Sequence, residues 1–233
     1  MTVPYVEIAP SESAYPSALR GVVEDSPIYA AGNTALLSAR AIGICGSRNA
    51  STDALEYAFE FGREAAQHGF VVVSGYARGV DRQAHKGALQ AGGATIAVLP
   101  EGIERFRVNG ELHPYVDLQS NFLAISMFEP DAAWTTWRAM NRNKLIVGLS
   151  VGLFVIEARE KGGTIDAARQ AVRQGKPLWA IAYSTQQPGR EGNVKLLQEA
   201  AIPLKLHSDL RKALQDASTA APEPVQQLAL SLH

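Results

Sequence analysis

Two apolar runs of strand length each end at a small polar residue beside glycine, and a segment of helical periodicity follows each of them. Residues 41–45 lead into Gly46-Ser47-Arg48, and residues 70–73 lead into the loop 74–79. A parallel α/β sheet builds anion sites in this way. The strand brings the chain to the sheet edge, glycine lets the backbone come close to a ligand, and the next helix directs free N–H groups at it. Because an arginine follows in each loop, the junctions predict a site for the phosphates of a nucleotide or of a nucleic-acid backbone.

Apolar runs of strand length alternate with helical segments along the rest of the chain. The sequence predicts strands at residues 41–45, 70–73, 94–99, 122–125, 151–157 and 178–182, and helices at residues 53–68, 80–91, 135–149, 165–174, 193–201 and 208–216. The strands are apolar on both faces, as strands of a buried parallel sheet are. This alternation indicates an α/β fold class with a doubly wound, mostly parallel sheet.

The chain divides into three regions. Residues 1–40 hold several prolines and no long periodic segment, so we expect an irregular lead-in that packs on the core, with a short helix near residues 15–23. Residues 41–216 form the predicted α/β domain. Residues 217–233 begin with alanine, serine, threonine and proline, which predicts a flexible tail.

The overall charge does not mark the chain as a nucleic-acid binder, since its formal net charge is -1 and many such proteins are strongly basic. A local basic patch would be sufficient. Cys45 is the only cysteine, which excludes an intrachain disulfide and favours a reducing compartment. No stretch approaches the roughly 20 apolar residues of a membrane span, and the N-terminus lacks the features of a signal peptide. The sequence therefore predicts a cytoplasmic protein that does not enter membranes.

The carboxyl ends of parallel strands lie at one edge of a sheet, so the loops 46–51, 74–81, 100–109 and 157–164 should meet there. Arginines in these loops could pair with phosphate through their planar fork, and glycine-rich loops could form nests of N–H groups. The predicted phosphate-binding residues of the loops are Gly46, Ser47, Arg48, Ser74, Gly75, Arg78, Gly79, Lys161, Gly163 and Thr164. A predicted helix that carries residues 141–144 could add to them. Ordinary tight turns and a helix cap remain the alternative for the same residues.

Groups that could support catalysis are few. Glu157 ends a predicted strand and could act in acid–base chemistry, although a structural acceptor for loop amides or a partner for an arginine is the alternative that we favour. Asp81 and His85 lie one helical turn apart, but two potential ligands without a third predict no metal site. No Ser–His–Asp arrangement follows from the spacing. We therefore expect no metal, no cofactor and no catalytic residue.

Five aromatic residues fall in or near the predicted site loops, namely Tyr76, Phe106, Tyr115, Trp134 and Trp137. Aromatic side chains stack on unpaired bases in proteins that bind single strands. The three-residue spacing of Trp134 and Trp137 is more typical of packing within the fold. Both interpretations stay open for these residues.

Several motifs together resemble those of the DprA/Smf family of DNA-processing proteins. They are Gly46-Ser47-Arg48, the run from Val73 to Leu89, the run from Gly93 to Leu99, the run from Arg142 to Ser150, Val155-Ile156-Glu157-Ala158, Gly163-Thr164 and Gly192-Asn193. The likeness covers residues 15–205, and its most specific part is residues 74–89.

This resemblance implies an extended Rossmann-like domain that binds single-stranded DNA at its basic edge. It implies a non-enzymatic recombination mediator that loads a RecA-type recombinase onto incoming strands during natural transformation, and that works as a homodimer. In that family the Gly-Ser/Thr-Arg loop contacts phosphate, which assigns this role to Ser47 and Arg48. By the same resemblance, the basic residues that would line the pocket are Arg78, Arg142, Lys144 and Lys161.

The wider superfamily to which that family belongs, known as SLOG, leaves two alternatives open. A sensor of a nucleotide-derived ligand would suit the near-neutral charge of this chain. A LOG-like nucleoside-monophosphate phosphoribohydrolase would carry a catalytic glutamate and a Gly-Gly-x-Gly-Thr loop. Residues 162–164 reproduce that loop only in a shorter form.

Overall fold

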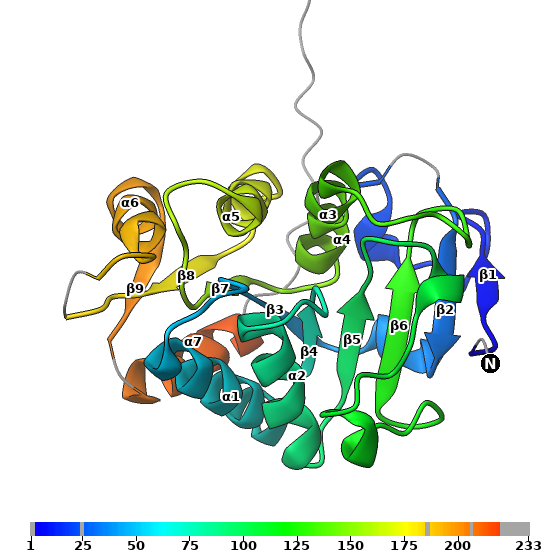
Figure 1. Cartoon of the computed structure of the whole chain (residues 1–233), viewed down its shortest axis with the longest axis horizontal. Helices are drawn as coiled ribbons and strands as arrows, with labels where there is room; N and C mark the ends of the chain where they lie inside the picture. The colour runs from blue at the N-terminus through cyan, green and yellow to red at the C-terminus, as the bar shows by residue number, and fades with distance from the viewer. Residues whose placement is uncertain (1–2, 24–25, 185–186, 206, 220–233) are drawn as a thin grey trace, which may run out of the picture.

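The core of the molecule is a nine-stranded sheet in the order β1-β2-β6-β5-β4-β3-β7-β8-β9 (Figure 1). The computed structural model describes residues 3–23, 26–184, 187–205 and 207–219. Within them the strands are β1 (Val6–Ile8), β2 (Ile28–Gly32), β3 (Ala41–Cys45), β4 (Val71–Ser74), β5 (Thr95–Val98), β6 (Phe122–Ser126), β7 (Leu153–Val155), β8 (Leu178–Ile181) and β9 (Ile202–Leu204). Every pairing from β6 across to β9 is parallel. The predicted α/β class with a mostly parallel sheet is therefore confirmed.

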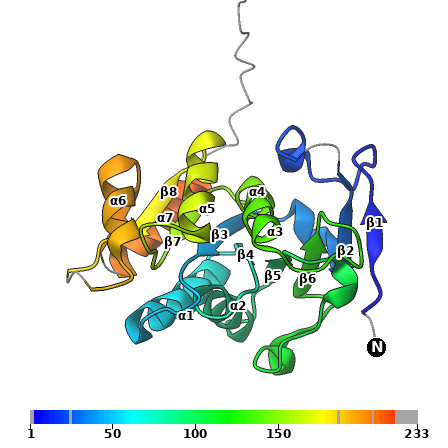
Figure 2. The same ribbon diagram turned by 45° about the horizontal axis from the view of Figure 1, so that its top comes forward.

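Helices cover both faces of the sheet, as Figures 1 and 2 show. The α-helices of the described residues are α1 (Thr52–Gln67), α2 (Val80–Gln90), α3 (Thr136–Asn141), α4 (Asn143–Gly148), α5 (Gly163–Arg173), α6 (Glu191–Glu199) and α7 (His207–Thr219). Short 3₁₀ helices lie at Ser17–Leu19, Thr34–Ser38, Ile103–Arg105 and His113–Tyr115. The helices α1, α2 and α7 lie on one face, and α3 to α6 lie on the other. None of the helices in the part of the chain described here is long and apolar enough to cross a bilayer.

Alternation along the strands fills both layers of the core. In β3, Ala41 and Cys45 pack in the layer below α4, α5 and α6, whereas Ile42 and Ile44 pack in the layer with α1, α2 and α7. Successive side chains of a strand point to opposite faces, so an uninterrupted apolar strand needs helices on both sides. The double winding predicted from the sequence follows from this requirement.

The first forty residues differ from the predicted irregular lead-in, because they contribute two strands to the sheet. β2 pairs antiparallel with β6, and β1 pairs antiparallel with β2. Gly32 ends β2 where the backbone of β6 comes close, since a methyl group on it would lie 2.3 Å from the carbonyl oxygen of Phe122. The predicted short helix near residues 15–23 is a single 3₁₀ turn, Ser17–Leu19.

The predicted helix over residues 135–149 is two short helices. α3 and α4 meet at Arg142, which caps both of them at φ -63° and ψ -17°. Near the C-terminus, α7 begins one residue before the predicted 208–216 and ends at Thr219. Residues 217–219 of the predicted tail therefore belong to α7, and residues 220–233 lie outside the described residues.

The chain changes direction at β3. From β3 it proceeds through β4, β5 and β6 on one side, and it then crosses to β7, β8 and β9 on the other side. The loops that follow β3 and β7 therefore diverge at the carboxyl edge of the sheet. In open α/β sheets, ligands bind at such a switch point.

Candidate anion-binding site

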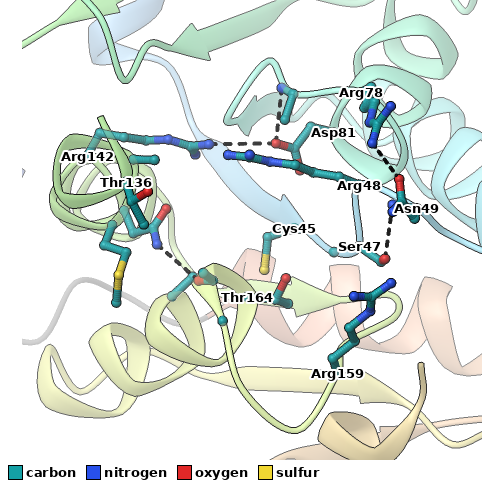
Figure 3. A pocket seen from close by; sticks show the side chains of 18 of the residues that line it. Cys45, Ser47, Arg48, Asn49, Arg78, Asp81, Thr136, Arg142, Arg159 and Thr164 are labelled. Carbon is teal, nitrogen blue, oxygen red and sulfur yellow. Dashed lines mark hydrogen bonds and ion pairs between the residues drawn. The ribbon is translucent and has the colours of Figure 1, made fainter. Parts of the chain in front are cut away.

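A cavity of about 410 Å³ lies at the switch point, and four segments line it (Figure 3). These segments are the loop after β3, the loop between β4 and α2, the region from residue 134 to 143 that includes α3, and the loop between β7 and α5. Two of them follow neighbouring parallel strands, β3 and β7. The cavity therefore occupies the crevice that the topology opens.

The charged side chains on the cavity wall are mostly positive. Five cationic side chains line it, those of Arg48, Arg78, Arg142, Arg159 and Lys161, whereas Asp81 is the single carboxylate among the described lining residues. All of these cations except Arg142 are exposed. In Figure 3, Arg48, Arg78 and Arg142 lie on one side of the cavity, and Arg159 lies on the opposite side, in the loop after β7. Such an arrangement attracts an anion and can hold it from two sides.

The loop after β3 is held in place by its own polar groups. The backbone N–H of Ser47 donates to the carbonyl oxygen of Glu157 at 2.8 Å, which joins this loop to the end of β7. The Ser47 hydroxyl accepts from the N–H of Asn49 at 3.2 Å, a turn that serine commonly forms. Arg78 donates to Oδ1 of Asn49 at 2.8 Å. The loop therefore presents Arg48 on a backbone that is fixed at both ends.

Gly79 lets the loop after β4 lie directly against the loop after β3. It has φ +83°, and a methyl group on it would lie 2.4 Å from the carbonyl oxygen of Ser47. That same oxygen accepts from the N–H of Val80 at 3.2 Å. Glycine is needed here for both the left-handed conformation and the close approach.

Arg142 lies deep in the cavity with only 6% of its surface exposed. Its Nη2 donates to the carbonyl oxygen of Gly75 at 3.2 Å and lies 3.8 Å from Oδ2 of Asp81. Burial lowers the pKa of the Arg142 guanidinium, and the charge of Asp81 opposes this shift. Burial likewise raises the pKa of Asp81, against the effect of Arg142. Nε of Arg142 is buried and has no hydrogen-bond partner among the described residues.

The loop after β7 supplies the opposite wall. Gly162 has φ +129° and precedes α5, which begins at Gly163. Asn143 donates from Nδ2 to the carbonyl oxygen of Gly163 at 3.1 Å, which ties the start of α5 to α4. The first N–H groups of a helix have no partner within the helix and favour anions. The N-terminus of α5 therefore adds to the positive potential of the cavity.

Eight of the twelve residues predicted to bind phosphate line the cavity. These are Gly46, Ser47, Arg48, Arg78, Arg142, Lys161, Gly163 and Thr164. The other four are placed elsewhere. The hydroxyl of Ser74 is buried and donates to the carbonyl oxygen of Ile44 at 2.6 Å. Gly75 and Gly79 lie so close to other segments of the chain that a methyl group on either would overlap them. Lys144 is not among the described residues of the cavity wall.

The loop 100–109, which we expected at this edge, contributes no described residue to the cavity wall. It follows β5, and β4 separates β5 from β3 in the sheet. The region before and within α3 takes its place, with Trp134, Thr136 and Met140. Strand order decides which loops meet, and local sequence patterns do not reveal that order.

Glu157 has the structural role that we favoured. Its carboxylate accepts from the backbone N–H of Ser51 at 3.1 Å and from the Ser51 hydroxyl, and it lies 3.6 Å from Nε of Arg190. Glu157 and Arg190 are 2% and 3% exposed. The Arg190 guanidinium also pairs with Asp53 and lies 3.7 Å from the ring centre of Tyr183. This buried network fixes the start of α1 relative to β7.

His85 and Asp81 have different partners, since Asp81 accepts from the N–H of Ala77 at 3.3 Å and His85 pairs with Thr95. The Thr95 hydroxyl donates to the carbonyl oxygen of Val72 at 2.7 Å, so the bond between Thr95 and Nδ1 of His85 has the histidine as donor. Nε2 of His85 is then unprotonated, and it has no partner among the described residues. Burial lowers the pKa of His85 to about 3. Within the described ranges, no three His, Cys, Asp or Glu side chains gather in a way that could hold a metal ion.

The amino-acid sequence of this chain is similar to those of known proteins. The family model described as DNA recombination-mediator protein A matches residues 7–215. The chain is 30% identical over 216 residues to DNA processing protein DprA of Bacillus subtilis, covering 92% of this chain and 73% of that protein.

Two solved structures share the fold. DprA of Streptococcus pneumoniae superposes with a TM-score of 0.79 at 28% identity, over 89% of this chain and 74% of the other. DprA of Helicobacter pylori, described for its unique mode of binding single-stranded DNA, superposes with a TM-score of 0.77 at 24% identity, over 93% of this chain and 99% of that chain.

Proposed function

The chain belongs to the DNA recombination-mediator protein A family, and from this premise we propose that its basic cavity binds single-stranded DNA. One observation carries the proposal. Among the described residues, five cationic side chains, a single carboxylate and the start of α5 surround the cavity at the carboxyl ends of β3 and β7. A phosphodiester backbone presents the repeated negative charge that such a crevice would neutralise. The Helicobacter pylori relative is described as binding single-stranded DNA, which supports the same ligand class here.

The two walls would hold the strand from opposite sides. On one side, Arg48 would pair with a phosphate from the loop that Ser47 fixes. At the base of the cavity, the guanidinium of Arg142 would add its positive charge beneath the phosphate. On the other side, Arg159 and Lys161 would pair with the same or the next phosphate. The remaining predicted residues on the wall, Gly46, Arg78, Gly163 and Thr164, would complete the contact surface.

The wider role would be that of a recombination mediator without catalytic activity. We place the protein in the cytoplasm, where it would load a RecA-type recombinase onto strands taken up during natural transformation, acting as a homodimer. The family description supports mediation of recombination. The recombinase, the dimer and the link to competence are parts of the proposal, and a recombinase-assembly assay on coated single strands tests the first of these separately from DNA binding.

Fluorescence anisotropy of a labelled dT oligonucleotide, titrated with salt, tests the DNA-binding proposal. We expect binding at low salt, weaker binding to duplex, and a log–log salt slope of about -0.7 per phosphate contacted. Arg48→Glu should abolish most of the affinity. Lys212→Glu introduces a matched charge reversal on α7 at an exposed position outside the cavity and should bind as the native chain does.

The result also separates the alternatives. Native affinity in Arg48→Glu would show that the strand binds elsewhere. No binding at low salt, together with thermal stabilisation by a small nucleotide, would favour a sensor of a nucleotide-derived ligand. Release of free base from a nucleoside monophosphate would favour the phosphoribohydrolase, although Glu157 is held by Ser51 and Arg190 and is not on the described cavity wall.

A further inference from the structure

The cavity has one wall that differs from the rest in chemistry. The loops after β3, β4 and β7 supply cations and glycines, but the region around α3 supplies Trp134, Ala139 and Met140. Trp134 is 48% exposed and Met140 is 39% exposed. Large apolar side chains that remain open on the wall of a charged cavity indicate a ligand with an apolar surface of its own. A ligand composed only of phosphate would leave this wall unused.

Trp134 stands next to the arginine assigned to phosphate. The Cζ atom of Arg48 lies 5.6 Å from the ring centre of Trp134, a distance at which a cation and an aromatic ring attract each other. In a nucleotide, the anionic phosphate and the flat base are neighbouring parts of one unit. The pair of Arg48 and Trp134 therefore matches a nucleotide unit, with the guanidinium for the phosphate and the indole for the base.

The other aromatic candidates are engaged or lie off the cavity. Phe106 is 2% exposed. The Tyr76 hydroxyl accepts from the N–H of Asn109 at 2.7 Å, and its ring packs against Phe106. Tyr115 is not on the described cavity wall. Trp137 is 66% exposed and packs against Phe128 outside the cavity.

We propose that Trp134 stacks on a base of the bound strand and makes the cavity select single strands over duplex. In a duplex, the faces of the bases are stacked on one another and are closed to an indole ring. The inference rests on the proposed single-strand binding and adds the residue that recognises unpaired bases. Because every base has an aromatic face, this selection would not depend on sequence.

The test compares two oligomers of equal length and equal charge, one of dT and one of abasic spacer units. Trp134→Ala should weaken binding of the dT oligomer by about 5- to 150-fold and leave binding of the abasic oligomer unchanged. Trp134→Phe should restore most of the loss, since phenylalanine also offers a ring. The dT oligomer, and not the abasic one, should quench the fluorescence of the native protein, and Trp134→Phe should remove most of that quenching.

The abasic oligomer separates stacking from an indirect effect through Arg48. An equal loss on both oligomers would mean that Trp134 only positions Arg48, which overturns the inference. Unchanged dT binding by Trp134→Ala would also overturn it. Both results leave single-strand binding intact, whereas failure of the native protein to bind either oligomer would remove the proposed function itself. Thermal unfolding of each variant checks that it folds.

Discussion

The guanidinium of Arg142 occupies the space in which a side chain at position 75 would lie. A methyl group on Gly75 would be 1.8 Å from Nη2 of Arg142, and the carbonyl oxygen of Gly75 accepts from the same nitrogen at 3.2 Å. Gly75 therefore admits a buried cation from another segment of the chain. The loop that we expected to approach a phosphate directly instead positions an arginine at the base of the cavity.

Gly75→Ala should displace Arg142 and leave Asp81 buried without its partner. Breaking a buried ion pair from one side costs about 3–5 kcal/mol, so the free energy of unfolding in urea should fall by an amount of this order. Affinity for the dT oligonucleotide should fall as well. Gly163→Ala is the matched control for stability, because a methyl group there meets no atom within 4 Å. Native stability in Gly75→Ala would contradict the steric argument.

Arg190→Met should destabilise the fold strongly, because it leaves Glu157 buried without an opposite charge. The expected cost is about 3–5 kcal/mol in urea unfolding. Adding Glu157→Gln to this variant should recover much of the loss, since the buried charge is then removed. If the double variant were as unstable as the sum of the two single variants, the two residues would not be coupled.

The free energy of unfolding should decrease as the pH is lowered below about 6.5, because His85 is buried without a charge in the folded protein. Its folded-state pKa is about 3, and an unfolded histidine titrates near 6.5. Between these values only the unfolded state takes up the proton, so the free energy of unfolding should decrease by up to about 1.4 kcal/mol per pH unit from this group alone. The contribution is complete above pH 6.5 and is lost as the pH falls toward 3.

His85→Asn is the control for this prediction, because its side-chain amide can donate to Thr95 in place of Nδ1. Urea unfolding of the two proteins at a series of pH values between 7 and 4 gives the comparison. The difference in stability between native protein and variant should shrink as the pH falls. A constant difference would show that His85 does not titrate on unfolding.

Removing a positive charge from the loop after β7 should change the salt dependence of DNA binding more than it changes any preference for DNA sequence. Arg159→Gln and Lys161→Gln each remove an exposed cation from the cavity. If each contacts one phosphate, each should make the log–log slope shallower by about 0.7. Anisotropy with dT and mixed-sequence oligonucleotides measures both quantities, and a slope equal to that of the native chain would place the strand away from this loop.

Much of the fold could be predicted because the buried parallel strands are continuous apolar runs. β1 and β9 have three residues each, too few to establish a period, and β2 is flanked by residues that do not alternate. β9 also contains Pro203, which argues against a central strand, and the structure places it at the edge of the sheet. These strands are specified by their partners across the sheet and hence could not be identified from local sequence.

The site could be predicted in part for a similar reason. The loops after β3 and β7 were identifiable because each joins a strand to a helix through small residues. The burial of Arg142 and the position of Trp134 on the cavity wall depend on how α3 and α4 pack over the cavity. No local sequence pattern predicts this packing. Arg142 and Lys144 occupy one short segment, yet only Arg142 reaches the cavity.

The close contact between α1 and α2 has a consequence for engineering. Methyl groups on Gly62 and Gly87 would lie 2.1 Å and 1.9 Å from carbonyl oxygens of the opposite helix, so the two backbones touch. α1 and α2 follow the loops that carry Arg48 and Arg78, so the packing of the two helices fixes the position of one loop relative to the other. Transplanting this half of the site into another protein would require the whole unit from β3 to α2, and grafting either loop alone would lose the geometry.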